Sequence, residues 1–243
     1  MIIDCHCHLG KGDGFTDPWN TDAPLEPYFS RARAAGIDKT VVFAPSHSDY
    51  WTANAHVARL TAKYPDRYIG FAFVHPARDK GRIYQMVEQA IVEWGFRGIK
   101  AHRADAPLTR ETCEVARAFR VPILYDIGGQ TGIIEMVAPQ YPDVDFIVPH
   151  LGSFVDDFRA HVQLIDQLVR FPNVYADTST VRRFDYLIHA VKRAGAHKLL
   201  FGTDSPFFMH PSMELFKIRL LNLQGGDEAL VLGGNLRRLI DRT

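Results

Sequence analysis

Three features that assign many chains to a class are scarce or missing in these 243 residues. Only three cysteines are present, an odd number, so we expect no disulfide framework and a reducing, cytoplasmic location. The longest uninterrupted run of hydrophobic residues is four, far below the ~20 that a membrane helix needs. The N-terminus has no basic segment followed by an apolar one, so no secretory signal is expected.

An excess of charge of one sign is missing too. The 28 Lys and Arg residues balance 28 Asp and Glu residues, so no overall field attracts nucleic acid or an anionic membrane. We therefore expect neither as a partner and take a small molecule as the substrate. Several aromatic residues that look exposed are compatible with a homodimer. The composition that remains, 47% hydrophobic and 23% charged, is typical of a folded globular protein.

A repeated strand-and-helix pattern runs along the chain. Apolar runs begin near residues 2, 40, 67, 96, 122, 145, 174 and 198, which are 23 to 38 residues apart. This spacing favours βα units, and runs that are apolar throughout favour parallel strands covered on both faces. Eight units predict a single domain over residues 1–243, a (β/α)8 TIM barrel. The alternative, an open doubly wound sheet, usually has a glycine-rich phosphate loop after its first strand, and this chain has none there.

Helical spacing of apolar residues supports the helices between these strands. The faces that we expect to be buried are formed by Ile83, Val87, Ala90, Ile91 and Trp94, by Phe158, Val162, Ile165 and Val169, and by Phe184, Leu187, Ile188 and Val191.

Metal-ligand residue types recur where the predicted strands end, which in a barrel is the rim that carries the chemistry. His6 and His8 end the first strand and, being two apart, point to the same side. Two such imidazoles can bind one metal ion, although a surface hairpin with two ordinary histidines is the alternative. The neighbouring Cys5 and Cys7 then face the helices and have no catalytic role.

Two later strand ends add His150 and Asp204. Each has an ordinary alternative: a hydrogen-bonded loop histidine, and an aspartate that caps the turn before Pro206. Their position at the rim favours a functional role for both. Asp177 also ends a strand, but the sequence indicates no role for it.

Several motifs, in order along essentially the whole chain, resemble the amidohydrolase superfamily, in particular the amidohydrolase-2 branch that includes aminocarboxymuconate semialdehyde decarboxylase. They are residues 3–10 (IDCHCHLG), 95–102 (GFRGIKAH), 149–152 (PHLG), 202–207 (GTDSPF) and 234–239 (GNLRRL). The resemblance implies a distorted (β/α)8 barrel with one divalent metal ion, most often zinc. It also implies that His6, His8 and Asp204 are ligands, and that His150 is a ligand or the partner of the metal-bound water.

One position departs from the family pattern. The family has a histidine at the end of strand 5, where residues 122–128 (PILYDIG) place Asp126. If Asp126 is a ligand, two imidazoles and two carboxylates leave a divalent site formally neutral, which suits harder metals such as manganese better than zinc. Otherwise Asp126 orients one of the site histidines, or merely caps a loop.

Strand 4 contributes two residues that face inward, Lys100 and His102. We expect both at the substrate pocket, with Lys100 paired to Asp126 or Asp4. In other branches of the superfamily such a lysine is carboxylated and bridges two metal ions, which is the alternative here.

Two further groups are candidates for the pocket. The pair Arg182 and Arg183 would clamp a substrate carboxylate or else start a solvated helix. The aromatic candidates are Trp19, Trp51, Phe207 and Phe208.

The leading hypothesis is a metal-dependent hydrolase of a small, carboxylate-bearing amide, lactone or ester, with zinc as the first metal expected and manganese as the alternative. Asp204 would accept the proton of the attacking water and pass it on, and His150 would orient that water or stabilise negative charge. The alternatives are a metal-dependent decarboxylase of the same branch and a binding barrel that has lost its metal.

Overall fold

The computed structural model describes residues 1–13, 22–23, 25–206 and 209–241. Trp19, Phe207 and Phe208, which the sequence suggested as pocket residues, lie outside these ranges. The strands are β1 (Ile3–His8), β2 (Gly10–Lys11), β3 (Asp22–Ala23), β4 (Lys39–Phe43), β5 (Tyr68–Gly70), β6 (Ala72–Phe73), β7 (Ile99–His102), β8 (Ile123–Asp126), β9 (Phe146–Val148), β10 (Val174–Asp177) and β11 (Leu199–Leu200). The helices are α1 (Leu25–Ala34), α2 (Tyr50–Lys63), α3 (Ile83–Glu88), α4 (Arg110–Phe119), α5 (Gly132–Val137), α6 (Phe158–Arg170), α7 (Phe184–Ala194), α8 (Pro211–Leu220), α9 (Asp227–Ala229) and α10 (Asn235–Ile240).

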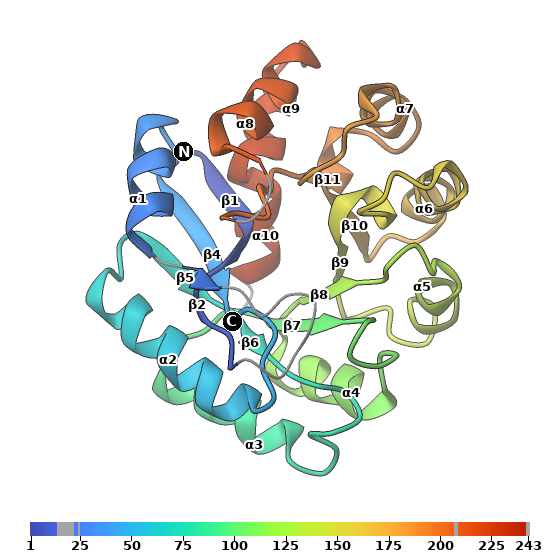
Figure 1. Cartoon of the computed structure of the whole chain (residues 1–243). Helices are drawn as coiled ribbons and strands as arrows, with labels where there is room; N and C mark the ends of the chain where they lie inside the picture. The colour runs from blue at the N-terminus through green and yellow to red at the C-terminus, as the bar shows by residue number, and fades with distance from the viewer. Residues whose placement is uncertain (14–21, 24, 207–208, 242–243) are drawn as a thin grey trace.

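The strands expected from the sequence all occur, and they form the inner ring of the molecule (Figure 1). They pair in parallel as two sheets, of order β1-β4-β5 and β6-β7-β8-β9-β10-β11. Strands β5 and β6 are two halves of one predicted strand, interrupted at Phe71. Helices α1 to α7 lie outside the ring, each following its strand along the chain (Figure 1).

Backbone hydrogen bonds join the two sheets at both of their edges. On one side, Phe71 N donates to Val42 O at 3.0 Å and Ala72 N donates to Gly98 O at 2.9 Å. On the other, the segment after β11 pairs with β1: His8 N donates to Ser205 O, and Asp204 N donates to His6 O, each at 2.8 Å. The fold is therefore the distorted (β/α)8 barrel that the sequence predicted, with β1 beside the residues that follow β11.

The apolar strands form the core, but helix α6 is rotated relative to the prediction, and Ile188 of α7, which was expected to be buried, is exposed. On α6, Phe158, Val162 and Val169 are exposed, and of the expected face Ile165 alone is buried. The buried stripe is instead His161, Leu164, Ile165 and Leu168, which has the i, i+3, i+4, i+7 spacing. The ring nitrogen Nδ1 of His161 lies 2.9 Å from the carbonyl of Leu151, and this bond lets a polar residue occupy a core position.

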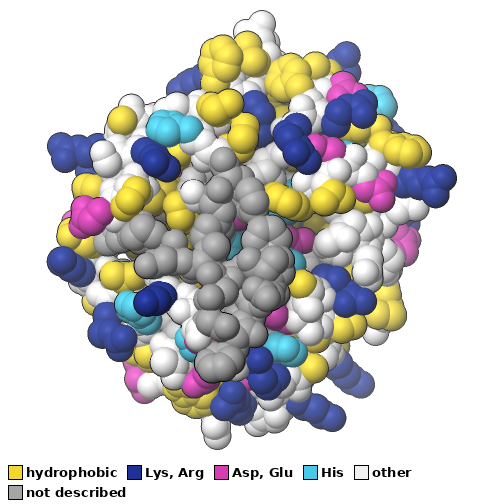
Figure 2. Space-filling view, viewed as in Figure 1, with side chains coloured by type: hydrophobic (Ala, Val, Ile, Leu, Met, Phe, Trp, Pro, Cys, Tyr) yellow, Lys and Arg dark blue, Asp and Glu magenta, His cyan; other side chains and the backbone are white. Residues whose placement is uncertain are grey.

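The surface of the face seen in Figure 1 is mixed in character. Figure 2 shows Lys and Arg side chains spread around this face, with acidic and apolar groups between them. Among the residues with described positions, no helix is both long and apolar enough to cross a membrane.

Candidate active site

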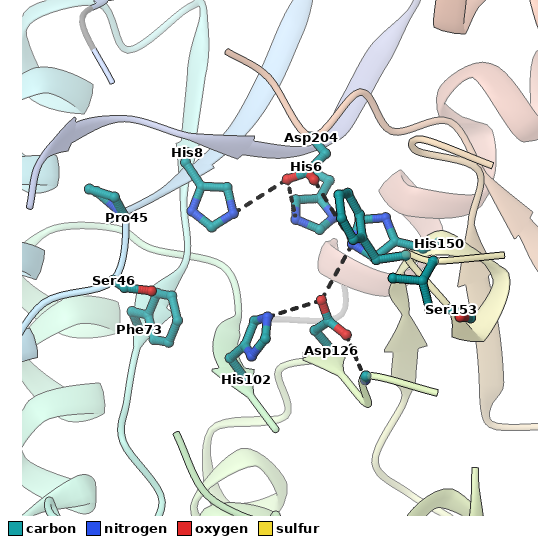
Figure 3. A pocket seen from close by; sticks show the side chains of 13 residues that line it. His6, His8, Pro45, Ser46, Phe73, His102, Asp126, His150, Ser153 and Asp204 are labelled. Atoms are coloured by element: carbon teal, nitrogen blue, oxygen red, sulfur yellow. Dashed lines mark hydrogen bonds and ion pairs between the residues drawn. The ribbon is translucent and has the colours of Figure 1, made fainter. Parts of the chain in front are cut away.

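A pocket of about 210 Å³ opens where the strands end at their carboxyl sides. It brings together six of the side chains that the sequence singled out, from β1, β7, β8 and the segments that follow β9 and β11 (Figure 3). The described residues that line it are His6, His8, Pro45, Ser46, Phe73, His102, Asp126, Gly128, His150, Ser153, Phe154, Val155 and Asp204.

Two histidines and one aspartate of this pocket converge. Nε2 of His6 lies 3.2 Å and Nε2 of His8 lies 3.4 Å from the same oxygen, Oδ1 of Asp204. His6 and His8 reach the pocket from one side of β1, as their spacing predicted. Asp204 is held beside them by its backbone bond to His6 O and adopts a φ of +54°, a region that few non-glycine residues occupy.

The second nitrogen of each ring is already engaged. Nδ1 of His6 donates to Oδ2 of Asp177 at 2.8 Å, and Nδ1 of His8 donates to the carbonyl of Ala44 at 3.0 Å. A carbonyl oxygen can only accept, so the proton of a neutral His8 stands on Nδ1 and its Nε2 lone pair faces Asp204. Burial lowers the pKa of His8 to about 4, so this ring is neutral near pH 7.

This arrangement fits a metal ion. A nitrogen lone pair and a carboxylate oxygen that face each other at 3.4 Å repel unless a cation or proton lies between them. Burial alone would raise the pKa of Asp204, but the nearby charges of His6 and His150 hold it below its usual range, so Asp204 is ionised. Two imidazoles and a carboxylate form a donor set that suits zinc and other divalent ions of its group.

A second group of potential ligands consists of His6, His150 and Asp177, which are fully buried. The Nδ1 atoms of its two histidines already form hydrogen bonds. Nδ1 of His6 binds Asp177, and Nδ1 of His150 lies 3.0 Å from the carbonyl of Ser179. We therefore treat this group as the support of the site and the convergent group of His6, His8 and Asp204 as the candidate for the metal.

Asp126 lies between two imidazoles on the opposite wall. Its Oδ2 is 3.1 Å from Nε2 of His102 and 3.4 Å from Nε2 of His150, and its Oδ1 accepts from Gly128 N at 2.8 Å. Burial alone would raise the pKa of Asp126, but the adjacent His102 and His150 hold it well below its usual range. Among the described residues, Asp126 does not join the convergent group of His6, His8 and Asp204.

His150 sits at the junction of these groups. Its Nε2 lies 4.0 Å from Oδ2 of Asp204, and its ring centre lies 5.1 Å from that of His6. Burial alone would lower the pKa of His150, but the hydrogen bond to Asp126 and the nearby carboxylates raise it to about 9. The ring is therefore a cation near pH 7 and can donate from Nε2.

Asp177 is the residue of the site whose importance the sequence did not reveal. Besides His6, its carboxylate accepts from the backbone N of His150 at 3.0 Å and from Ser179. The charge of His6 lowers its pKa although burial opposes this. Its place at the end of β10, at the same rim as the other candidates, was the one available signal.

Lys100 does not make the expected ion pair. Its side chain is fully buried, lies with Nζ 5.0 Å from the centre of the Phe43 ring, and Nζ has no hydrogen-bond partner among the described residues. Asp4 is engaged elsewhere, because it accepts hydrogen bonds from Tyr28 and Thr203. Burial lowers the pKa of Lys100, and the residue lies outside the described lining of the pocket.

The structure does not bring the arginine pair to the pocket. Arg182 binds Asp156 at 2.7 Å and Arg183 binds Asp185 at 2.8 Å, and both guanidinium groups are exposed. These contacts match the alternative, a solvated start of helix α7. Trp51, on α2, is partly buried against the core and is not among the described lining residues.

The family of the chain follows from a comparison with protein-family models. The amidohydrolase family, of the amidohydrolase-2 type, matches residues 3–241. The chain therefore belongs to this family, and it is an enzyme.

Solved structures agree on the fold. A 2,6-dihydroxybenzoate decarboxylase from Rhizobium has a TM-score of 0.72 at 17% identity, with 99% of each chain covered. A dihydroxybenzoic acid decarboxylase from Polaromonas, with bound manganese and 2-nitroresorcinol, has a TM-score of 0.71 at 18% identity, with 99% of this chain and 97% of that chain covered. A probable 2-pyrone-4,6-dicarboxylic acid hydrolase from Acinetobacter baumannii, with citric acid bound, has a TM-score of 0.76 at 15% identity, with 99% of each chain covered. No curated protein sequence matches the chain.

Proposed function

We propose that this chain is a metal-dependent hydrolase that acts on a small amide, lactone or ester. The observation that carries the proposal is the convergence of His6 Nε2, His8 Nε2 and Asp204 Oδ1, with the other nitrogen of each ring bound to an acceptor. These three residues would hold one divalent ion. Zinc is the first candidate because it prefers nitrogen ligands in small coordination sets, and manganese is the second.

A divalent ion bound there would make water a stronger acid and polarise a carbonyl oxygen. Asp204 would act as the base and then as the acid. One of its oxygens, Oδ1, faces the β1 histidines, whereas Oδ2 faces His150 across 4.0 Å and is free to take a proton from the attacking water. The same oxygen would then deliver this proton to the leaving group.

His150 would stabilise the negative charge that develops on the substrate. Its Nε2 proton points into the pocket toward Asp126 and Asp204, and its Nδ1 is fixed by the carbonyl of Ser179. A donor that is already oriented and positively charged lowers the energy of an oxyanion more than water does. Asp126 would keep His150 protonated and oriented instead of binding the metal, with His102 on its other side.

The pocket indicates a substrate of about one ring. An apolar cavity of about 150 Å³ accommodates benzene, and this pocket is about 210 Å³. Phe73, Phe154 and Val155 supply apolar walls, and His102 would contact the substrate at the partly exposed edge. The arginine pair has no part in this proposal.

The second candidate is metal-dependent decarboxylation of a small aromatic acid. It is favoured by the one-ring size and apolar walls of the pocket, together with the imidazolium of His150 beside them. In that reaction His150 would supply the proton that replaces the carboxylate on the substrate carbon. The residues that bind the metal would be the same.

The test determines which of two reactions one preparation of the protein catalyses. The metal-free protein is loaded with zinc or with manganese and incubated with a panel of lactones, esters and amides, and separately with hydroxybenzoic acids. A hydrolysed product without CO₂ supports the first candidate, and released CO₂ supports the second. Activity that is equal with and without metal, or unchanged in Asp204→Asn, would contradict both.

A further inference from the structure

A buried ion pair on helix α8 lies behind the candidate site. Glu214 and Lys217 are three residues apart, and Oε2 of Glu214 lies 2.7 Å from Nζ of Lys217. Glu214 is fully buried and Lys217 largely so. A buried ion pair contributes little stability by itself, because both charges lose their hydration. The other contacts of Glu214 and Lys217 therefore indicate the role of this ion pair.

Both members of the pair bind the backbone of the loop after β10. Oε2 of Glu214 accepts from Thr180 N at 3.1 Å, while Nζ of Lys217 donates to Val181 O at 2.8 Å and to Thr178 O at 3.3 Å. Thr180 has a φ of +54°, a conformation that costs a β-branched residue free energy. The loop therefore depends on outside contacts to keep this shape.

The same loop holds the site from behind. Oγ1 of Thr180 and the carbonyl of Ser179 each lie 3.0 Å from Nδ1 of His150. Ser179 also donates to Oδ1 of Asp177 from its N at 2.9 Å and from its Oγ at 2.6 Å. Through Asp177 the loop reaches His6, so one short segment supports both walls of the pocket.

We propose that Glu214 and Lys217 are positioning residues that fix residues 178–181 and thereby set the orientations of His150 and of the Asp177–His6 pair. Neither side chain is among the described residues that line the pocket, so both act through the loop. The consequence for metal binding rests on the proposed function, whereas the orientation of the two rings does not.

The chain offers a matched control for the lysine. Nζ of Lys198 donates to the carbonyls of Phe171, Pro172 and Val174 at 2.7, 2.9 and 3.0 Å, at the opposite end of β10 from the site. Lys217→Met and Lys198→Met therefore remove the same kind of side chain, with comparable loss of backbone contacts, from the two ends of one strand. For the glutamate, Glu214→Ala removes the acceptor of Thr180 N and Glu214→Gln keeps one.

The first measurement is the affinity of the full-length, metal-free chain for Mn²⁺ by calorimetric titration. We expect Lys217→Met and Glu214→Ala to weaken binding by about 10-fold or more, as is typical when a residue that supports a ligand is lost. Glu214→Gln should recover most of this loss, and Lys198→Met should bind as the wild type does.

The second measurement needs no metal. In the metal-free wild type, the ring N–H protons of His6 and His150 should give slowly exchanging low-field proton signals in NMR, since both are buried and hydrogen-bonded. These signals should broaden or vanish in Lys217→Met and persist in Lys198→Met. If Lys217→Met keeps them, or if both lysine variants lose them equally, the pair has only a general structural role. If the wild type binds no Mn²⁺ but the signals respond as expected, the proposed function fails and the positioning role stands.

Discussion

Nδ1 of His6 donates to Oδ2 of Asp177 at 2.8 Å, and this bond determines which nitrogen of His6 faces Asp204. The two residues lie on β1 and β10 and are 171 positions apart along the chain. Because Asp177 also receives the backbone N–H of His150, one carboxylate orients two histidines of the pocket.

We expect Asp177→Asn to weaken metal binding by about 10- to 100-fold without unfolding the chain. The amide can present its NH₂ group to His6 and so favour the wrong tautomer, and it lacks the charge that makes the ring a better ligand. The measurement is competition with a chelator for zinc. The control is Asp185→Asn, which removes an exposed carboxylate paired with Arg183. Equal affinity in the two variants would contradict the role of Asp177.

Asp126 is expected to control the charge of His150. With its partner ionised, the pKa of His150 is raised to about 9, so the ring carries a proton up to that pH in the metal-free chain. Asp126→Asn removes the main source of this rise, and the pKa should fall by about one to three units. An NMR titration of the imidazole signals measures the change. A pKa that stays near 9 in Asp126→Asn would show that another group holds the proton.

Lys100 is expected to cost stability. Its ammonium is fully buried, and among the described residues Nζ has no hydrogen-bond partner. A buried polar group without a hydrogen bond costs about 1–3 kcal/mol in mutated proteins, and an apolar side chain of similar size avoids this cost. We therefore expect Lys100→Met to unfold at an equal or higher temperature than the wild type. A clear loss of stability, together with a CO₂ adduct in native mass spectrometry, would favour the carboxylated lysine instead.

Two buried carboxyl groups should make the chain less stable as the pH rises toward neutrality. Burial raises the pKa of Glu214 from 4.5 to about 7 and that of Asp4 from 3.8 to about 6. Between those values the folded chain holds protons that the unfolded chain has released, so the free energy of unfolding falls with rising pH. The stability that each carboxyl group contributes is fully present below its pKa in the unfolded chain. It is lost as the pH rises through its pKa in the folded chain.

The variant Glu214→Gln isolates one of these groups. Because the amide does not titrate, the stability of the wild type relative to this variant should fall between about pH 4.5 and 7, by no more than about 1.4 kcal/mol for each pKa unit. Urea unfolding of both proteins at pH 5 and pH 8 measures this difference. A difference that is constant or rises with pH would contradict the raised pKa.

Much of the fold could be predicted because it depends on local patterns. The apolar runs gave the strands of the barrel, and the two-residue spacing of His6 and His8 placed both rings on one side of β1. The prediction of which face of α6 is buried was wrong because His161 occupies a core position, which a count of apolar residues cannot detect. The pairing of Lys100 with Asp4 was wrong because Asp4 is bound by Tyr28 and Thr203, contacts that the sequence does not indicate.

The site was predictable in its residue types but not in its pairings. The strand ends indicated His150, Asp204 and Asp126, yet nothing in the sequence shows that Asp126 lies between His102 and His150. The prediction that the arginine pair lines the pocket was wrong for a related reason. Arg182 is bound by Asp156, a residue 26 positions earlier whose proximity depends on the fold.

The amount of metal that the chain retains tests the proposed metal site most directly. Metal-free protein is incubated with zinc or manganese, dialysed, and analysed by elemental mass spectrometry, in parallel with His8→Ala and Asp204→Asn. We expect one equivalent in the wild type and a loss of at least 100-fold in affinity in each variant, since a direct ligand contributes more than its supporting groups. A wild type that retains no metal, or variants that retain as much as the wild type, would contradict this expectation.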